Sequence, residues 1–304
     1  MTTDILHEQK ILILDFGSQY TQNIARKVRE SQVYCEIHPC TLPFDEIKAF
    51  NAKGIILSGG PASVQEEDSP LCDRKLFELG IPILGICYGM QLITHILGGK
   101  VDPSPHREFG RAELMFKEFS HLFEEVKNNS TVWMSHGDRI ESIPDGFKAI
   151  ASSQNSPYAA MEDVERRYFG LQFHPEVTHT LQGKTIIDRF LHEICECPHE
   201  WTSANIAKEA VNKVKEEVGS GQVLLGLSGG VDSSVVAAIL HKAIGDQLVC
   251  VFVDHGLLRY HEGDQVMQTF AENLGVKVIR VNAMDRFFAA LEGITDPEEK
   301  RKVI

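Results

Sequence analysis

The sequence predicts an α/β protein of two domains, each built on a mainly parallel sheet. Short apolar runs alternate with stretches of helical periodicity, a pattern typical of parallel sheets covered by helices. The length of 304 residues fits two domains of ordinary size. The segment Cys195–Trp201 interrupts the periodicity. We therefore place the linker there and expect domains at residues 1–198 and 199–304.

In the first domain, a parallel set of strands precedes a more antiparallel set. The strands expected to be parallel are residues 11–15, 54–57 and 82–86. Helices are expected after the first of these to residue 29, after the third to residue 97, and over residues 178–194. The strands expected to be antiparallel are residues 111–116, 131–135, 149–153, 158–164 and 168–173. We expect residues 103–110, between the two sets, to form a moving loop.

In the second domain, a helix precedes three strand–helix pairs. Apolar residues between Ile206 and Val218 recur at helical spacing. The expected strands are residues 223–227, 248–253 and 277–281, and the expected helices are residues 233–244, 263–274 and 283–291. We expect no further capped element before Ile304.

Composition limits the classes of partner and compartment. The net charge of −13 argues against a nucleic-acid-binding surface. A nucleotide would have to be held locally, by helix N-termini, Mg²⁺ or a few basic side chains. No stretch reaches the ~20 apolar residues of a membrane helix, and the first ten residues lack the apolar core of a signal peptide. Seven cysteines without a C-x-x-C pair favour a reduced, cytoplasmic protein.

Cys87 is the strongest candidate for a nucleophile. It stands in Gly85-x-Cys87-x-Gly89, where a predicted strand meets a predicted helix, and this is the cysteine form of a nucleophile elbow. The helix N-terminus favours a thiolate, and the N–H of Tyr88 together with Gly59 would form an oxyanion hole. An isolated cysteine is more often a structural thiol, but the flanking glycines favour the reactive interpretation.

A base and its orienting acid are expected in Phe173-His174-Pro175-Glu176. His174 and Glu176 are two residues apart, so in an extended segment their side chains share a face. We therefore expect Cys87, His174 and Glu176 to form a catalytic triad. The ordinary alternative for His174 is a histidine that is satisfied within the core.

These motifs resemble those of the class I glutamine amidotransferases, over residues 10–195. The resemblance also includes Asp15–Gln19 and Ser58–Pro61. It implies that further residues hold glutamine or its oxyanion, namely Gly59, Tyr88, Gln91, Ser135, His136, Gly137 and Asp138. For His136 and Asp138, a polar turn remains an alternative.

A second site is expected between the strand at 223–227 and the next helix, where a glycine-rich loop meets a helix N-terminus and makes an anion cradle. The loop consists of Ser228, Gly229, Gly230, Val231, Asp232, Ser233 and Ser234. It lacks the lysine of a G-x-x-x-x-G-K-[ST] loop and resembles instead the PP-loop of ATP pyrophosphatases. The resemblance implies pyrophosphate binding, adenylyl transfer and an Mg²⁺ contact at Asp232. Val253, ending the next strand, is expected at the adenine, with Asp254 and Arg259 as weaker candidates.

The order of the two domains resembles that of the GMP synthetase family. The resemblance implies that glutamine supplies ammonia, that ATP with Mg²⁺ adenylylates XMP, and that ammonia displaces AMP to give GMP. No permanently bound cofactor is implied. Family members continue past Ile304 with a dimerisation domain, so we expect an incomplete member of a homodimeric enzyme, with XMP contacts beyond this chain. We expect a channel or domain closure to shelter the ammonia.

Other amidotransferases resemble the chain less. Asparagine synthetases use an N-terminal cysteine, which Met1-Thr2 does not offer. CTP synthetases carry a kinase-type phosphate loop, and thiolating PP-loop enzymes usually show extra cysteine pairs. An alternative of another class is a non-catalytic binding protein, against which Cys87, His174 and Glu176 argue.

Overall fold

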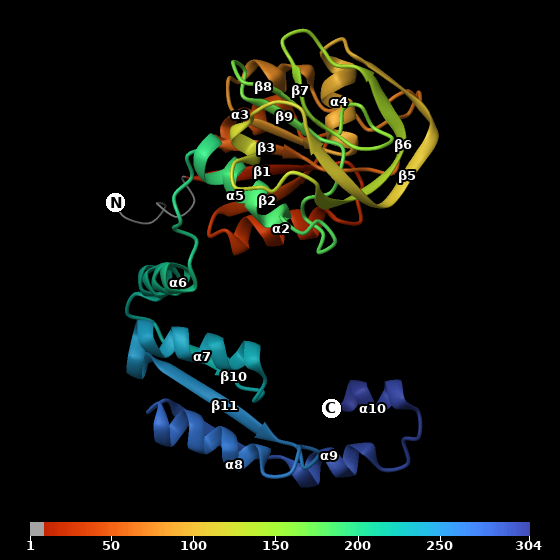
Figure 1. Cartoon of the computed structure of the whole chain (residues 1–304). Coiled ribbons are helices and arrows are strands. Elements are labelled where there is room, and N and C mark those ends of the chain that lie inside the picture. The colour runs from red at the N-terminus through yellow and green to blue at the C-terminus, as the bar shows by residue number, and fades with distance from the viewer. Residues whose placement is uncertain (1–8) are drawn as a thin grey trace. The chain divides into compact units, whose positions relative to one another are not determined.

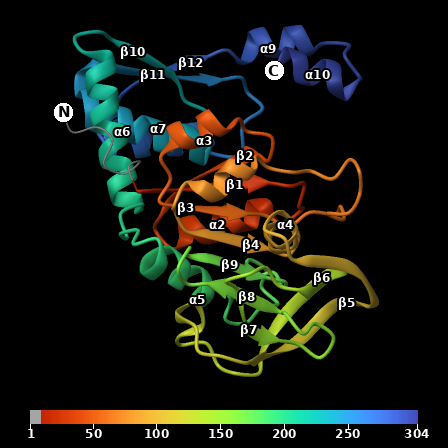
Figure 2. The same cartoon turned by 90° about the horizontal axis from the view of Figure 1, so that it is seen from above.

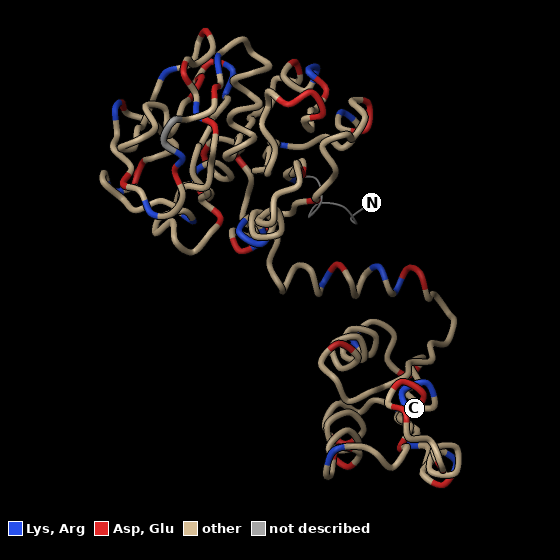
Figure 3. The backbone as a smooth tube through the Cα atoms, turned by 90° about the vertical axis from the view of Figure 1, so that its right-hand side faces the viewer, with Lys and Arg blue, Asp and Glu red and all other residues tan. Residues whose placement is uncertain are grey.

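The structure is a computed structural model that describes residues 9–304, apart from the side chains of residues 105 and 106. Residues 1–8 therefore lie outside the described residues. They include Met1-Thr2 and most of the ten residues in which the sequence shows no apolar core of a signal peptide. The chain divides into two compact units between Thr202 and Ser203, and we describe each by itself (Figure 1). Lysine and arginine are interspersed with aspartate and glutamate along both units (Figure 3).

The first unit is built on a nine-stranded sheet of order β2-β1-β3-β4-β9-β8-β7-β5-β6. Its parallel part consists of β2 (Tyr34–Pro39), β1 (Lys10–Asp15), β3 (Gly54–Leu57), β4 (Ile83–Ile86) and β9 (Tyr168–Leu171). Its antiparallel part adds β8 (Ala160–Asp163), β7 (Lys148–Ser152), β5 (Lys100–Phe116) and β6 (Ser130–Ser142). Figure 2 shows β5 and β6 as a long pair at one side of this unit.

Both faces of the parallel part are buried. Along β1, Ile11 and Ile13 belong to one apolar cluster, whereas Leu12 and Leu14 belong to another. Because side chains alternate between the faces of a strand, a continuous apolar run fills the core on both sides of the sheet. The helices of this unit are α2 (Thr21–Glu30), α3 (Phe44–Phe50), α4 (Tyr88–Ile96) and α5 (Gly183–Asp188), the last continued by a π-helical turn (Arg189–Ile194), and short 3-10 turns lie at Arg74–Glu78 and His121–Phe123.

The second unit is a three-stranded parallel sheet of order β10-β11-β12. Its strands are β10 (Val223–Gly226), β11 (Leu248–Asp254) and β12 (Lys277–Asn282). Its helices are α6 (Ser203–Val218), α7 (Val231–Ile244), α8 (Glu262–Val266) with a π-helical continuation (Met267–Asn273), α9 (Met284–Leu291) and α10 (Pro297–Val303), and a 3-10 turn lies at Gly245–Gln247. The central strand buries Leu248, Cys250 and Phe252 on one face, against Ala237 of α7 and Phe270. The predicted fold class, two α/β units with mainly parallel sheets, is confirmed.

Three expectations about local structure are wrong. Residues 103–110 belong to strand β5 and do not form a loop, because they pair with β6 at both ends of an irregular stretch. The helix expected from residue 178 begins only at Gly183, since the hydroxyl of Thr180 donates a hydrogen bond to the carbonyl of His174 and holds a turn there. The chain also has a capped last element, α10.

That last helix carries a signal that the sequence analysis missed. Asp296 accepts hydrogen bonds from the N–H groups of Glu298 and Glu299 at 2.9 and 3.0 Å, and Pro297 occupies the first helical turn. An aspartate cap followed by proline is a regular helix start. Strand β2 and helix α3 were missed as well. No helix within residues 9–304 is both long and apolar enough to span a bilayer.

Gly183 offers a test of how the helix α5 start is packed. A Cβ at this position would lie 2.8 Å from the carbonyl carbon of Pro175 and closer still to its oxygen. Backbone must therefore shift in a Gly183→Ala variant, and we expect the free energy of unfolding to fall by about 2–4 kcal/mol in chemical denaturation. Gly137→Ala is the control, because the nearest atom lies 3.9 Å away. Equal stability of the two variants would refute this packing.

Candidate functional site

Cys87 occupies a strained turn between β4 and α4. Its φ and ψ are 52° and −104°, a combination that a residue with a side chain rarely adopts. Such a conformation costs of order 1–3 kcal/mol and persists only where the surrounding structure fixes it. Here the N–H of Cys87 donates a hydrogen bond to the carbonyl of Leu171 at 2.7 Å. The turn has the geometry of a nucleophile elbow.

The two glycines beside Cys87 serve close approach and do not supply a positive φ themselves. A Cβ at Gly85 would lie 2.6 Å from the carbonyl oxygen of Gly89, and a Cβ at Gly89 would lie 2.8 Å from Cβ of Leu57. The structure shows that the unusual backbone angle belongs to Cys87, and that the glycines let helix α4 pack against the strands.

His174 and Glu176 form a buried hydrogen-bonded pair next to Cys87. Nδ1 of His174 lies 2.7 Å from a carboxylate oxygen of Glu176, and both residues are at most 3% exposed. Since a carboxylate accepts, Nδ1 carries the proton and Nε2 is left for another partner. A Cβ placed on Gly59 would lie 3.0 Å from the His174 ring and 3.6 Å from Cβ of Cys87. The imidazole and the thiol thus flank the same point.

The electrostatics favour a protonated imidazole at His174. Burial by itself lowers the pKa of His174, but the charges of Cys87 and Glu176 and hydrogen bonds to both raise the pKa well above its ordinary value. Tyr20 closes this side of the site, with its ring 5.3 Å from the His174 ring in an edge-on arrangement. The arrangement supports an imidazolium at His174 that the Glu176 carboxylate orients beside Cys87.

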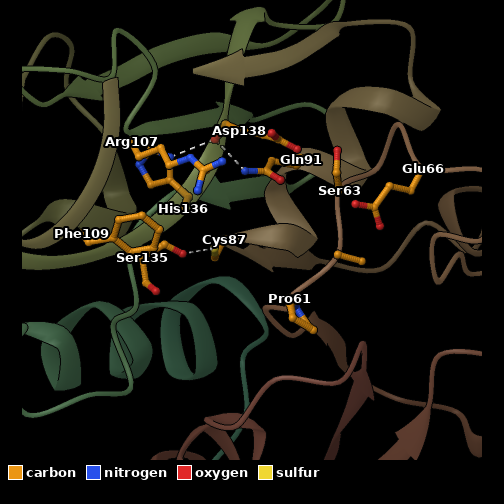
Figure 4. Close-up of a pocket in the computed structure, with 13 residues that line it drawn as sticks. Pro61, Ser63, Glu66, Cys87, Gln91, Arg107, Phe109, Ser135, His136 and Asp138 are labelled. Atoms are coloured by element: carbon orange, nitrogen blue, oxygen red, sulfur yellow. Dashed lines mark hydrogen bonds between the residues drawn. The ribbon is translucent and has the colours of Figure 1, made fainter. Parts of the chain in front are cut away.

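A cavity of about 380 Å³ opens beside Cys87 (Figure 4). This size suits a small metabolite. Its walls come from the segment after β3, the start of α4 and the β5–β6 pair. The lining residues are Gly60, Pro61, Ala62, Ser63, Glu66, Cys87, Gln91, Arg107, Phe109, Ser135, His136, Gly137 and Asp138.

Most of the expected glutamine-binding residues gather at this cavity, but not in the expected form. Ser135–Asp138 lie within strand β6 and form neither a loop nor a polar turn. Gln91 uses its amide nitrogen to hold the carbonyl of Asp138, 3.0 Å away, so it braces the cavity wall. The side chain of Tyr88 turns away and donates to the carbonyl of Pro70 at 2.7 Å. Tyr88 begins α4, so its N–H lacks an acceptor within the helix and stays available to an oxyanion.

Sequence reasoning missed several residues of this site. Glu66, Arg107 and Phe109 line the cavity. The side chain of Glu108 is buried, with its Oε2 3.3 Å from Nε2 of His136. The alternation of inward and outward side chains along β5 would have marked Glu108 as inward-facing, but residues 103–110 were expected to form a loop and not a strand. No local signal marks Arg107, because an irregularity in the β5–β6 pairing brings it to the cavity.

The expected phosphate loop connects β10 to α7 in the second unit. Gly230 precedes the helix, and Gly229 takes a φ of +75°, which favours glycine. The hydroxyls of Ser228 and Ser233 lie 3.0 Å apart, and that of Ser234 donates to the carbonyl of Gly230 at 2.7 Å. The loop is largely exposed, and its N–H groups lie at the start of a 14-residue helix. Exposed N–H groups at the start of a helix favour the binding of an anion such as phosphate.

Val253 lies at the same end of the sheet as this loop. The parallel pairing places Gly226 opposite Val251, so residues after 226 and after 251 emerge from one edge. Val253 is 40% exposed there. Asp254 forms a salt bridge with Arg280, in which Oδ2 of the aspartate lies 2.6 Å from Nη2 of the guanidinium. The hydrogen bond from this guanidinium holds the pKa of the Asp254 carboxyl below its usual range. The backbone N–H of Arg259 donates to Glu262.

Asp232 lies in the first turn of α7 with an exposed side chain. Within residues 9–304, no group of three or more histidine, cysteine, aspartate or glutamate side chains could hold a metal ion. A single carboxylate beside a phosphate cradle suits Mg²⁺ that arrives bound to a nucleotide, since Mg²⁺ takes one or two carboxylates plus phosphate oxygens. The residues present therefore fit a nucleotide-borne Mg²⁺ ion.

Comparison with known sequences gives two family matches. Residues 12–194 match the class-I glutamine amidotransferase family, and residues 203–302 match the NAD synthase family. Similar curated proteins include the glutamine-hydrolysing GMP synthases of Thiobacillus denitrificans, 56% identical over 97% of this chain, and Neisseria meningitidis serogroup C, 57% identical over 98%. The chain spans 58% and 57% of the lengths of these relatives.

A solved structure supports the first match. A protein of Thermoplasma acidophilum, described as a candidate component of a GMP synthase, is 34% identical with a TM-score of 0.55. The similarity covers 62% of this chain and 95% of that protein.

We expect His174 to keep its proton well above pH 6.5, the ordinary histidine pKa. Because the folded-state pKa is the higher one, the stability that this pair contributes is complete below about pH 6.5 and is lost as the pH rises through the folded-state value. NMR titration of the His174 ring measures the pKa, and Glu176→Gln should lower it. Titration at or below the ordinary value would contradict the proposed ion pair.

Proposed function

The chain belongs to the class-I glutamine amidotransferase family, and we propose that its first unit hydrolyses the side-chain amide of glutamine. The observation that carries this proposal is the strained backbone of Cys87 at the border of a cavity of metabolite size. The side chains of Cys87 and His174 both lie next to Gly59. Glu176 orients the imidazole from behind. This is the arrangement that a cysteine nucleophile needs: a thiolate, a proton carrier and an orienting acid.

The reaction proceeds in two steps. The Cys87 thiolate attacks the amide carbon of glutamine, and the N–H of Tyr88 with the backbone at Gly59 stabilises the oxyanion. His174 gives its proton to the departing nitrogen, so ammonia leaves and a glutamyl thioester remains. Water then attacks the thioester while His174 takes up a proton, and glutamate and the free thiol result. Glu176 holds the imidazole in place throughout.

For the second unit, we propose ATP-dependent activation of XMP, so that the two units together serve GMP synthesis. The order of the units and the identity to glutamine-hydrolysing GMP synthases support this proposal. Ser228–Ser234 would hold the pyrophosphate group, Asp232 would contact Mg²⁺, and Val253 would border the adenine. Bound Mg²⁺ neutralises charge that develops on the phosphates. Ammonia from the first unit then displaces AMP from the activated XMP.

We also propose a cytoplasmic, homodimeric protein in which ammonia is sheltered during transfer. All seven cysteines are free and buried, as expected in a reducing compartment. Ammonia released to water at neutral pH becomes mostly ammonium, which is not a nucleophile. If ammonia derived from glutamine exchanged fully with solvent before use, shelter by a channel or domain closure would be wrong.

Replacement of Cys87 tests the glutaminase directly. We expect Cys87→Ala to abolish glutamine hydrolysis, and Glu176→Gln to lower kcat about 100-fold or more because the imidazole loses its orienting group. Release of glutamate measures the activity. Cys40→Ala is the matched control, since Cys40 is buried away from the cavity, and it should keep near-normal activity. Glutamate release by Cys87→Ala at the original rate would refute the mechanism.

The phosphate loop is tested through Mg²⁺. We expect Asp232→Asn to weaken the binding of ATP in the presence of Mg²⁺ by about 10-fold, through loss of a carboxylate contact, with little change when Mg²⁺ is absent. Calorimetry measures both affinities. Asp246→Asn, in the exposed turn after α7, is the control. With XMP supplied, formation of ADP and phosphate in place of AMP and pyrophosphate would contradict adenylyl transfer.

A further inference from the structure

Gln172 is a fully buried polar residue within an apolar segment. It follows strand β9, and Phe169, Leu171 and Phe173 around it belong to one apolar cluster. Gln172 itself is 0% exposed. A buried amide must find its hydrogen-bond partners within the protein, because an unsatisfied one costs the full penalty of leaving water. Neither the catalytic triad nor the oxyanion hole uses Gln172, so its partners are informative.

The Gln172 side chain is the middle member of a row of hydrogen bonds that ends at the reactive sulfur. Nε2 of Gln91 lies 3.0 Å from the carbonyl oxygen of Asp138 and 3.4 Å from Oε1 of Gln172. Nε2 of Gln172 in turn lies 3.9 Å from Sγ of Cys87, a long contact of the kind that hydrogen bonds to sulfur make. Gln91 and Asp138 line the cavity (Figure 4), whereas Gln172 lies behind its wall. The row therefore connects that wall to Cys87.

The direction of these hydrogen bonds is fixed at the Asp138 end. A backbone carbonyl only accepts, so the amide of Gln91 must face it with its nitrogen. The second N–H of that nitrogen needs an acceptor, which is Oε1 of Gln172. Because an amide carries oxygen on one side and nitrogen on the other, the nitrogen of Gln172 faces Cys87. A flipped Gln172 amide would place two nitrogens face to face, so the sulfur receives an N–H donor.

This donor is needed once the thiol has lost its proton. Sγ of Cys87 also lies 3.5 Å from the carbonyl oxygen of Ser135, to which the thiol donates (Figure 4). After ionisation that carbonyl has no proton to accept, and its partial negative charge repels the sulfur. The N–H of Gln172 is attracted to the negative sulfur, and a buried, water-free position strengthens such a bond. The Gln172 amide therefore favours the form of Cys87 that reacts.

We propose that Gln172 is a further catalytic residue, whose amide N–H holds the sulfur of Cys87 and stabilises the charge that the sulfur carries as a nucleophile. This inference rests on the proposed glutaminase activity. The thiolate is the nucleophilic form of cysteine, and a hydrogen bond to a charged group is stronger than one between neutral groups. Because Gln172 is buried and lies outside the cavity lining, it acts on the sulfur and not on the binding of glutamine.

Alkylation of Cys87 tests this assignment without glutamine. Iodoacetamide reacts with thiolates, so the alkylation rate of the full chain at Cys87 follows the ionised fraction of that thiol. Gln172→Met keeps a similar volume and removes the N–H. We expect it to lower the rate at about pH 7 by about 10- to 100-fold, as loss of a hydrogen bond to a charged group implies. At about pH 10, above the ordinary thiol pKa of about 8.5, the rate should come within about twofold of that of the unsubstituted chain. Mass spectrometry of the Cys87 peptide measures the rate.

Thr94→Val is the matched control. Thr94 is also 0% exposed and lies on α4, but its hydroxyl donates to the carbonyl of Met90 and contacts the sulfur of Met161. This variant should keep near-normal alkylation of Cys87 and near-normal kcat. In glutamine hydrolysis, Gln172→Met should lower kcat about 10- to 100-fold and change KM by less than about threefold, because the lost bond serves the reacting sulfur.

The unsubstituted chain supplies a second measurement that does not depend on the folding of a variant. The side-chain N–H resonances of Gln172 should shift over the pH range in which alkylation of Cys87 accelerates, because their acceptor gains charge. Those of Gln154, an exposed glutamine, should not follow that range. Constant Gln172 resonances would overturn the assignment, as would a Gln172→Met variant whose alkylation is unchanged or falls equally at every pH. If the predicted shifts and rates appear but the unsubstituted chain does not hydrolyse glutamine, the glutaminase proposal fails instead.

Discussion

The backbone turn at Cys87 is the constraint on which the first unit depends. A residue with a side chain is held at a φ of 52°, and the cost is offset by the close packing of β4, α4 and β3 around it. Gly85 and Gly89 permit that packing because any side chain there would meet backbone. The result is a thiol that stands at the tip of a turn, beside the N-terminus of a nine-residue helix and at the edge of a cavity.

The other half of the site comes from a segment that is fixed by different contacts. His174 and Glu176 follow β9, and the carbonyl of His174 accepts a hydrogen bond from Thr180. Pro175, between the two, packs closely against the backbone of Gly183 at the start of α5. The base and its acid therefore keep their positions through the packing of α5, and the thiol keeps its position through β4 and α4. The two halves meet because β4 and β9 are neighbours in the sheet.

The sequence predicted the two-unit α/β architecture, the Cys87 elbow and the His174–Glu176 pair, because each is encoded in a few adjacent residues. Glycines around a cysteine and a His-x-Glu spacing have local physical meanings. The contribution of Arg107 was not predictable in this way, since it depends on a bulge between strands that lie far apart in the sequence. Gln91 is expected to hold glutamine and lines the cavity, but the hydrogen bond from its amide nitrogen to the carbonyl of Asp138 was not foreseen. Such roles are set by partners across the cavity and are not visible in one segment.

The most direct test of the account is the detection of the covalent intermediate on Cys87. The chain is mixed with glutamine, quenched in acid within a turnover and analysed by mass spectrometry of its peptides. The account predicts a glutamyl group on the peptide that contains Cys87, and its loss when Cys87 is replaced by serine. A glutamyl group on any other cysteine, or ammonia released while Cys87 remains unmodified at every quench time, would contradict the account.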